Sequence, residues 1–236
     1  MIIEALYPEI CCLYGDMANI RYLSQCLPDA EIKMTAFTEK PYFADNHVDM
    51  LYLGSMSELT VSKVLTKLMP LKDRLAEVIA SGTVVLFTGN AMSILGEKIL
   101  CDDGEIPALG LYPHYTKRFM DDRHNSMFFG TYNGYEMVGC KSQFDFYYNV
   151  KNLPFIKVGG GVGNNPDDEF EGFHDGNLFA TALLGPLLIL NPRFTKEILT
   201  LLGTDAAPAF EKEATEAFEF RLNELKTEGA QLIMHC

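Results

Sequence analysis

The chain alternates short apolar runs with segments whose apolar residues recur every three or four positions. The run Ile2 to Leu6 and the stretch Ala30 to Thr35 have the length and composition of strands. Between them, Ile20, Leu23 and Leu27 follow a helical spacing. The first part of the chain is therefore predicted to fold as strand, helix, strand.

The same rhythm continues to residue 96. The run VDMLYLGSMSE (48–58) predicts a buried strand that ends at Gly54, and the stretch VVLFTGNAMSILG (84–96) predicts a strand, a turn and a helix-like tail. Two helices are predicted between these strands, one carrying Val61, Val64, Leu65 and Leu68 and one from Pro70 to Ala80. Strands that alternate with helices in this way favour an α/β fold with a mostly parallel sheet, covered on both faces.

The pattern changes from Ile106 onward. Short strands, aromatic residues and turns, as in MFFGTYNGYEMVG, predict an antiparallel β-segment in the middle of the chain. A mainly apolar segment follows from Asn177 to Pro192. The tail from Pro208 to Gln231 is predicted to be an amphipathic helix that packs on the body, on the helical spacing of Phe210, Ala214, Ala217, Phe218, Leu222 and Leu225.

Length and charge limit the function classes. A chain of 236 residues with 48% hydrophobic content predicts a single domain over residues 1–236 with one sizeable core. The net charge of −13 disfavours nucleic acid and anionic membrane partners. The opening MIIEALYPEI lacks the basic segment of a signal peptide, and no apolar run approaches the length of about 20 residues that a membrane span needs.

The six cysteines have no regular spacing and include no CxxC pair. Free thiols in a reducing compartment are the favoured interpretation, and a cytoplasmic location is the expectation.

Two predicted strands end in glycine, at Gly54 and Gly89. In a parallel α/β sheet, ligands and catalytic groups gather at the carboxyl ends of the strands, so a site is expected at these two loops. Glycine permits a sharp turn and lets backbone amides approach an anion, although simple turn chemistry accounts for such glycines more often.

Several motifs in the chain carry a family resemblance. The run GGVGNNPDDEFEG (160–172), Asn177 and the run ATALLGPLLILNPRFTKEIL (180–199) resemble the closing section of glutaminase domains of the cobyric acid synthase (CobB/CobQ) class. The opening LYGDMANIRYL (13–23) resembles the first loop of that family, with Gly15, Asp16 and Asn19 in register. Within the class, the chain is most similar to the glutaminase subunits that supply ammonia for amidating the lipid II peptide.

The resemblance implies a class I glutamine amidotransferase fold, which is flavodoxin-like. It also implies hydrolysis of glutamine through a cysteine thioester, with a histidine base and backbone amides that hold the oxyanion. At the matching positions, this sequence has Gly89 for the nucleophile and Leu184 for the base. Ser55 and Met56 follow Gly54 where the family has a run of glycines, and Gln143 stands in place of a second histidine.

These replacements predict a degenerate site, since glycine cannot attack a carbonyl and leucine cannot accept a proton. Glycine at position 89 would also adopt the positive φ of a nucleophile corner without strain. The expected remnant of the glutamine pocket consists of Gly54, Ser55, Met56, Thr88, Asn90 and Gln143.

The sequence offers other candidates for chemistry. Thr88 and Ser93 are hydroxyl nucleophile candidates without a histidine in a recognisable motif, and Cys140 is a candidate for a relocated thiol. The acidic loop NPDDEFEGFHDG does not match a calcium loop, and the GGGVGNN run does not complete a phosphate-binding motif. Neither a metal nor a cofactor is predicted.

Three functions remain open on the sequence. The first is a non-catalytic amidotransferase-like scaffold or regulator that binds a synthetase, for example of the Mur ligase type. The second is a domain that binds a small-molecule ligand in the remodelled pocket. The third is a residual glutaminase that serves cell-wall or cobalamin-type amidation.

Overall fold

A computed structural model describes residues 1–228 and 233–234 of the chain. Among the described residues, ten strands form one sheet in the order β14-β8-β11-β12-β13-β4-β3-β1-β2, with β9 paired to β8. The five strands of its parallel part are β13 (Leu178–Thr181), β4 (Val84–Thr88), β3 (Met50–Leu53), β1 (Ile2–Leu6) and β2 (Glu31–Thr35). The α/β fold with a parallel sheet portion is confirmed, and the strand bounds agree with the prediction within a few residues.

The rest of the large sheet is antiparallel. It consists of β8 (His124–Tyr132), β9 (Tyr135–Gln143), β11 (Pro154–Gly160), β12 (Phe170–Asp175) and β14 (Ile233–Met234). A second sheet has the order β10-β7-β5-β6, formed by β10 (Asp145–Tyr148), β7 (Tyr115–Arg118), β5 (Lys98–Cys101) and β6 (Gly104–Pro107). The hairpin β8–β9 is the MFFGTYNGYEMVG segment, so the predicted antiparallel segment is confirmed.

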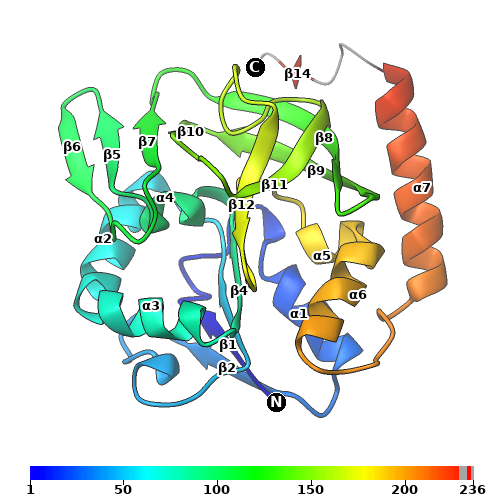
Figure 1. The fold of residues 1–236 in the computed structure, drawn as a ribbon, viewed down its shortest axis with the longest axis horizontal. Coiled ribbons are helices and arrows are strands. Elements are labelled where there is room, and N and C mark those ends of the chain that lie inside the picture. The colour runs from blue at the N-terminus through cyan, green and yellow to red at the C-terminus, as the bar shows by residue number, and fades with distance from the viewer. Residues whose placement is uncertain (229–232, 235–236) are drawn as a thin grey trace.

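Helices cover both faces of the parallel strands (Figure 1). The helices α2 (Glu58–Leu68), α3 (Lys72–Ala80) and α4 (Met92–Leu95) lie on one side. The helices α1 (Ala18–Cys26), α5 (Leu187–Leu190) and α6 (Pro192–Leu201) lie on the other. Short 3-10 turns occupy Leu13–Gly15, Tyr42–Ala44, Met69–Leu71 and Gly89–Ala91.

Each central strand contributes side chains alternately to two cores, because successive residues of a strand point to opposite faces. Leu51 and Leu53 of β3 pack with α2 and α3, whereas Met50 and Tyr52 pack with α1 and α6. Every residue of β3 and β4 is buried, which explains why these strands read as continuous apolar runs.

The last long helix is α7 (Glu211–Glu228), which packs on β8, β9, α5 and α6. It buries Leu222 and Leu225 against Val138. The predicted start at Pro208 is three residues early, and the predicted end at Gln231 lies outside the described residues. Phe210 precedes the helix and is 67% exposed, so its assignment to the packed face was wrong. Only part of the predicted apolar face is therefore buried against the body of the protein.

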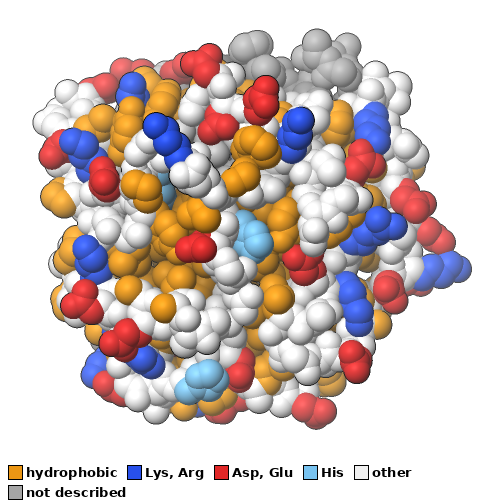
Figure 2. Space-filling model, in the orientation of Figure 1, with side chains coloured by type: hydrophobic (Ala, Val, Ile, Leu, Met, Phe, Trp, Pro, Cys, Tyr) orange, Lys and Arg blue, Asp and Glu red, His pale blue; other side chains and the backbone are white. Residues whose placement is uncertain are grey.

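Hydrophobic side chains gather near the middle of the face shown in Figure 2, whereas acidic and basic side chains are interspersed around them. Within the described residues, no helix is both long and apolar enough to cross a bilayer. The five cysteines in the described part of the chain are all free, and Cys236 lies outside it.

Candidate functional site at the carboxyl edge of the sheet

Two neighbouring strands bring the predicted site together. Strands β3 and β4 run parallel with Leu53 paired to Phe87, so the residues that follow them meet at one edge of the sheet. Gly54, Ser55 and Met56 follow β3, and Gly89 follows β4. Leu184 reaches the same place three residues after β13, the other neighbour of β4.

Gly89 has a φ of +61°, the left-handed conformation that side chains rarely adopt. An ideal Cβ on Gly89 would lie 2.5 Å from the Cβ of Ser55 and 3.0 Å from Cδ2 of Leu184. Carbon atoms without a bond between them do not approach to 2.5 Å, so any side chain at position 89 requires the neighbouring loop to move. The corner therefore has no side chain at position 89 and, in this arrangement, no room for one.

The backbone amides of the loop after β3 are already engaged. The N–H of Ser55 donates to Oδ2 of Asp16 at 2.7 Å, and the N–H of Met56 donates to Oδ1 of Asn90 at 3.0 Å. Asn90 also donates from Nδ2 to the Met56 carbonyl at 2.7 Å. An oxyanion would have to displace both side chains before it could use these amides.

Asp16 belongs to a buried polar network beneath the corner. Its Oδ2 also accepts the Thr88 hydroxyl at 2.6 Å, and the Tyr52 hydroxyl lies 3.0 Å from that same hydroxyl oxygen. Asn19 donates to Oδ1 of Asp16 at 3.1 Å. Burial raises the pKa of the Asp16 carboxyl, and these hydrogen bonds oppose the rise. Asp16 and Asn19 of the motif LYGDMAN thus hold the residues after β3 and β4 in place through buried hydrogen bonds.

Leu184 is tied to the middle β-segment. Its N–H donates to the Cys140 carbonyl at 2.9 Å, and the Cys140 N–H donates back to the Leu184 carbonyl at 3.4 Å. Burial raises the pKa of the Cys140 thiol, so the thiol stays protonated at neutral pH. Cys140 is brought beside Leu184, as a relocated nucleophile requires, but its surroundings do not activate it.

Gln143 lies in the wall of the site. Its Nε2 donates to the Asp145 carbonyl at 2.6 Å, and its Oε1 has no hydrogen-bond partner among the described residues. The sequence placed Gln143 at this site only by alignment, and the geometry puts it there together with Ser142 and Phe144.

The cavity at this edge holds only about 40 Å³. Ser55, Met56, Gly89, Asn90, Gln143 and Leu184 line it, whereas Gly54 and Thr88 lie beneath the lining. Pockets for small molecules usually have about 300–1,000 Å³, so this cavity is too small for an amino acid. None of the four described histidines lines it.

Tyr14 also lines the cavity. It is a non-glycine residue with a φ of +56°, and its hydroxyl donates to Oγ of Ser142 at 3.2 Å. Arg123 in turn donates to the Tyr14 hydroxyl at 3.2 Å. The first loop therefore reaches across the cavity to β9.

The two hydroxyl candidates are held by carboxylates. The Thr88 hydroxyl donates to Asp16, and the Ser93 hydroxyl donates to Oδ2 of Asp145 at 2.8 Å. Both residues are fully buried. The hydrogen bonds of these two hydroxyls go to carboxylate and phenol groups, those of Asp16, Tyr52, Asp145 and Tyr147. Neither hydroxyl is therefore paired with a histidine base in the described part of the chain.

Two buried ion pairs support this edge and were missed by sequence reasoning. Arg118 binds both oxygens of Asp145, at 2.6 and 2.9 Å. Lys141 lies 3.5 Å from Glu171, and Glu171 also accepts the N–H of Ala182 at 2.8 Å. The alternation of side chains along β9 could have placed Lys141 on a buried face. The sequence does not show, however, that its partner is Glu171, which lies on another strand.

The GNN and EG motifs have a structural explanation. Oδ1 of Asn164 accepts the N–H of Gly172 at 2.8 Å, and Asn165 donates to the Tyr147 carbonyl at 2.8 Å. Asp168 accepts the N–H of Phe170 at 3.0 Å and Nδ2 of Asn164 at 3.1 Å. Asp168 of the acidic loop is thus used in hydrogen bonds to neighbouring residues. Within the described residues, no group of three or more His, Cys, Asp or Glu side chains could hold a metal ion.

The fold has counterparts among solved structures of glutamine amidotransferases. One covers 86% of this chain and all of the other chain with a TM-score of 0.54 at 13% identity. Another, from Thermotoga maritima, covers 96% of this chain and 92% of the other with a TM-score of 0.54 at 10% identity. At such identity, these structures establish the fold, which is that of the glutamine amidotransferases.

Curated sequences identify the family more narrowly. The chain is 31% identical over 195 residues to the lipid II isoglutaminyl synthase (glutamine-hydrolyzing) subunit GatD of Staphylococcus aureus, covering 79% of this chain and 78% of that protein. It is 28% identical over 209 residues to the corresponding GatD subunit of Streptococcus pneumoniae, covering 84% of this chain and 78% of that protein. No family model matches the chain. The chain belongs to the GatD family of glutamine amidotransferases, which confirms the resemblance.

Proposed function

We propose that this chain is a catalytically degenerate member of its family, which serves a synthetase or ligase partner as a scaffold or regulatory subunit and does not hydrolyse glutamine. The observation that carries the proposal is the corner itself. Gly89 has no side chain, and the Cβ of Ser55 occupies the space that a side chain at position 89 would need.

Three further features support the loss of glutaminase chemistry. Leu184 stands at the position of the base, the Ser55 and Met56 amides are capped by Asp16 and Asn90, and the cavity has about 40 Å³. Each feature opposes a different requirement of the reaction, namely attack, oxyanion stabilisation and substrate binding. The single amidotransferase-like domain thus keeps the fold around the remnant pocket without its chemistry.

The partner is inferred from the relatives, whose names describe subunits of a synthase. A chain that keeps this fold without its chemistry would contribute binding rather than ammonia. We expect the partner to be a ligase-type synthetase, such as a Mur-ligase-like enzyme, that takes ammonia from another source.

Reconstitution with the synthetase tests this proposal. The complex should form in size-exclusion chromatography, and the synthetase in it should use free ammonium but not glutamine as the nitrogen donor. A complex that uses glutamine, and loses this use when Cys140 is replaced by serine, would overturn the degenerate site. Failure of this chain to bind any synthetase of its own cell would overturn the scaffold role.

A ligand-binding function of the same cavity has one observation in its favour, which is the unpartnered Oε1 of Gln143. A cavity of about 40 Å³ admits one or two water-sized molecules. A glutamine-sized ligand would require Tyr14 and its loop to move aside.

A further inference from the structure

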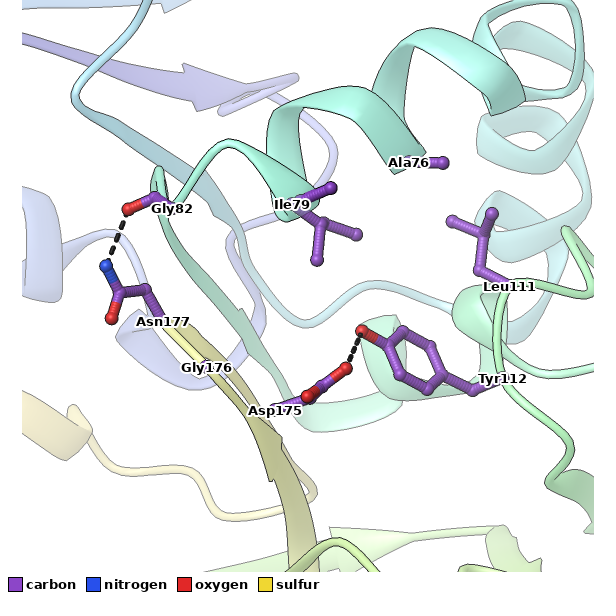
Figure 3. A pocket seen from close by; sticks show the side chains of 9 residues that line it. Ala76, Ile79, Gly82, Leu111, Tyr112, Asp175, Gly176 and Asn177 are labelled. Carbon is purple, nitrogen blue, oxygen red and sulfur yellow. Dashed lines mark hydrogen bonds between the residues drawn. The ribbon is translucent and has the colours of Figure 1, made fainter.

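A second and much larger hollow lies at the opposite edge of the sheet (Figure 3). It has a volume of about 460 Å³, within the usual range for small-molecule sites. Gly82 precedes β4 and Asn177 precedes β13, and both line it. The hollow therefore sits at the amino-terminal ends of the strands whose carboxyl ends lead to Gly89 and Leu184.

The walls of this hollow combine apolar side chains with polar groups in nearly equal share. Ala76 and Ile79 of α3 form one side, and Leu111 with the ring of Tyr112 forms the other. Figure 3 shows these side chains around a common space, with Asp175 at its base. Such walls suit a short aliphatic chain that passes between α3 and the Leu111–Tyr112 segment.

The charged group in this hollow is a carboxylate. Asp175 is the only ionisable acid or base among the lining residues apart from the Tyr112 phenol, and it makes no ion pair within the described residues. The Tyr112 hydroxyl donates to Oδ2 of Asp175 at 3.0 Å. This bond orients the exposed carboxylate, which makes no ion pair with another described residue.

The end of α3 adds to the negative potential. The helix ends at Ala80, which lines the hollow, and the carboxyl end of a helix carries a partial negative charge. The Asn177 amide donates to the Gly82 carbonyl at 2.6 Å, which holds the turn after α3 against the turn before β13. Ala80 at the helix end and Asp175 thus both line the hollow, from two separate segments of the chain.

We propose that this hollow binds an alkylammonium group, in which a primary ammonium pairs with Asp175 and a short aliphatic stem lies between Ile79 and Leu111. An ammonium at this place would satisfy the carboxylate and could also lie against the Tyr112 ring. The group can belong to a free small amine or to a lysine side chain of a peptide, since both present the same chemistry.

A titration of the full chain, followed by amide NMR shifts at neutral pH and low salt, tests this site. The probes are butylammonium and a lysine blocked at both its amino and carboxyl ends, compared with butyrate and butanol of matched length. Saturable shifts of the Gly82, Gly176 and Asn177 amides are expected with the two cations only. They should weaken as salt is added.

Matched variants assign the interaction. Asp175→Asn should weaken cation binding at least tenfold, whereas Asp103→Asn, which removes the same charge from an exposed turn, should change it less than twofold. Ala76→Lys places an ammonium within the hollow and should also abolish binding while Asp175 remains intact. Tighter binding of the blocked lysine would indicate a peptide ligand, and tighter binding of butylammonium a small amine.

The proposal is overturned if neither cation gives saturable shifts, or if butanol or butyrate shifts the same amides. It is also overturned if Asp175→Asn and Asp103→Asn weaken binding equally, because the cations would then respond to net charge alone.

Discussion

The Cβ of Ser55 lies 2.5 Å from the point where a Cβ on Gly89 would stand. The two residues follow adjacent parallel strands, so the sheet register brings their loops together, and the φ of +61° at Gly89 sets the close approach. Position 55 carries the side chain at this corner, and position 89 has none.

The first prediction concerns this pair. Gly89→Ala should lower the free energy of unfolding by roughly 2–4 kcal/mol, because it adds a positive-φ penalty to an overlap with Ser55. In the Ser55→Gly background, the cost should fall to about 1–2 kcal/mol, since the backbone penalty and the close approach to Cδ2 of Leu184 remain. Urea unfolding of the four proteins of this cycle measures the coupling. Costs that add within about 0.5 kcal/mol would show that the two positions do not compete for space.

The second prediction concerns the carboxylate beneath the corner. Asp16→Asn should destabilise the chain by about 1–3 kcal/mol, because an amide cannot accept both the Ser55 N–H and the Thr88 hydroxyl at one oxygen while accepting from Asn19 at the other. Asp29→Asn, at an exposed position, is the matched control and should change stability by less than about 0.5 kcal/mol. Equal effects of the two substitutions would contradict the network described for Asp16.

The third prediction concerns pH. Burial lowers the pKa of His114 to about 4, while its ring contacts the Met92 carbonyl. A histidine with a lowered folded pKa adds stability above its unfolded pKa of about 6.5, and this stability is lost as the pH falls toward 4. The free energy of unfolding should therefore decrease by roughly 3 kcal/mol from pH 7 to 4 on account of this group.

The variant His114→Phe should remove that part of the pH slope, whereas His47→Asn removes only an exposed pair with Asp49 and should change the slope much less. Urea unfolding at several pH values compares the three proteins. An unchanged slope in His114→Phe would contradict the assignment to His114.

The fourth prediction concerns the buried pair of Lys141 and Glu171. Lys141→Met should cost about 3–5 kcal/mol, because it leaves the Glu171 carboxylate buried without its cation. Adding Glu171→Gln should recover part of this loss, since the amide carries no charge. Denaturant unfolding of the single and double variants measures the recovery, and a double variant as unstable as the sum of the singles would contradict the pairing.

Sequence reasoning predicted the parallel strands well, because β3 and β4 are buried on both faces and read as unbroken apolar runs that end in glycine. It also placed Ser55, Met56 and Asn90 at one edge, because the ends of neighbouring parallel strands must meet there. The contact between the Ser55 Cβ and position 89 could not be predicted, since it depends on a φ of +61° and a few tenths of an ångström.

Other features were missed. The helix α6 was not predicted as a separate element, although Asn191 followed by Pro192 is typical of a helix start. The capping of the Met56 amide by Asn90 depends on a side-chain direction that the sequence does not encode locally. The hollow at the amino-terminal ends of β4 and β13 is lined by residues from 76–82, 111–112 and 175–177. These segments are distant in the sequence, and only the folded chain makes them neighbours.

The most direct test of the degenerate site measures glutamine hydrolysis and covalent labelling together. The purified chain, alone and with its synthetase partner, is incubated with glutamine while glutamate and ammonia are followed. A diazoketone analogue of glutamine, which alkylates a catalytic cysteine, is then added and the intact mass is recorded. The variant Ser55→Gly/Gly89→Cys/Leu184→His provides the comparison, because it restores the thiol, the base and the space at the corner. We expect neither product nor adduct in the natural chain. Glutamate formation above the blank, with an adduct on Cys140 and loss of both in Cys140→Ser, would contradict the account.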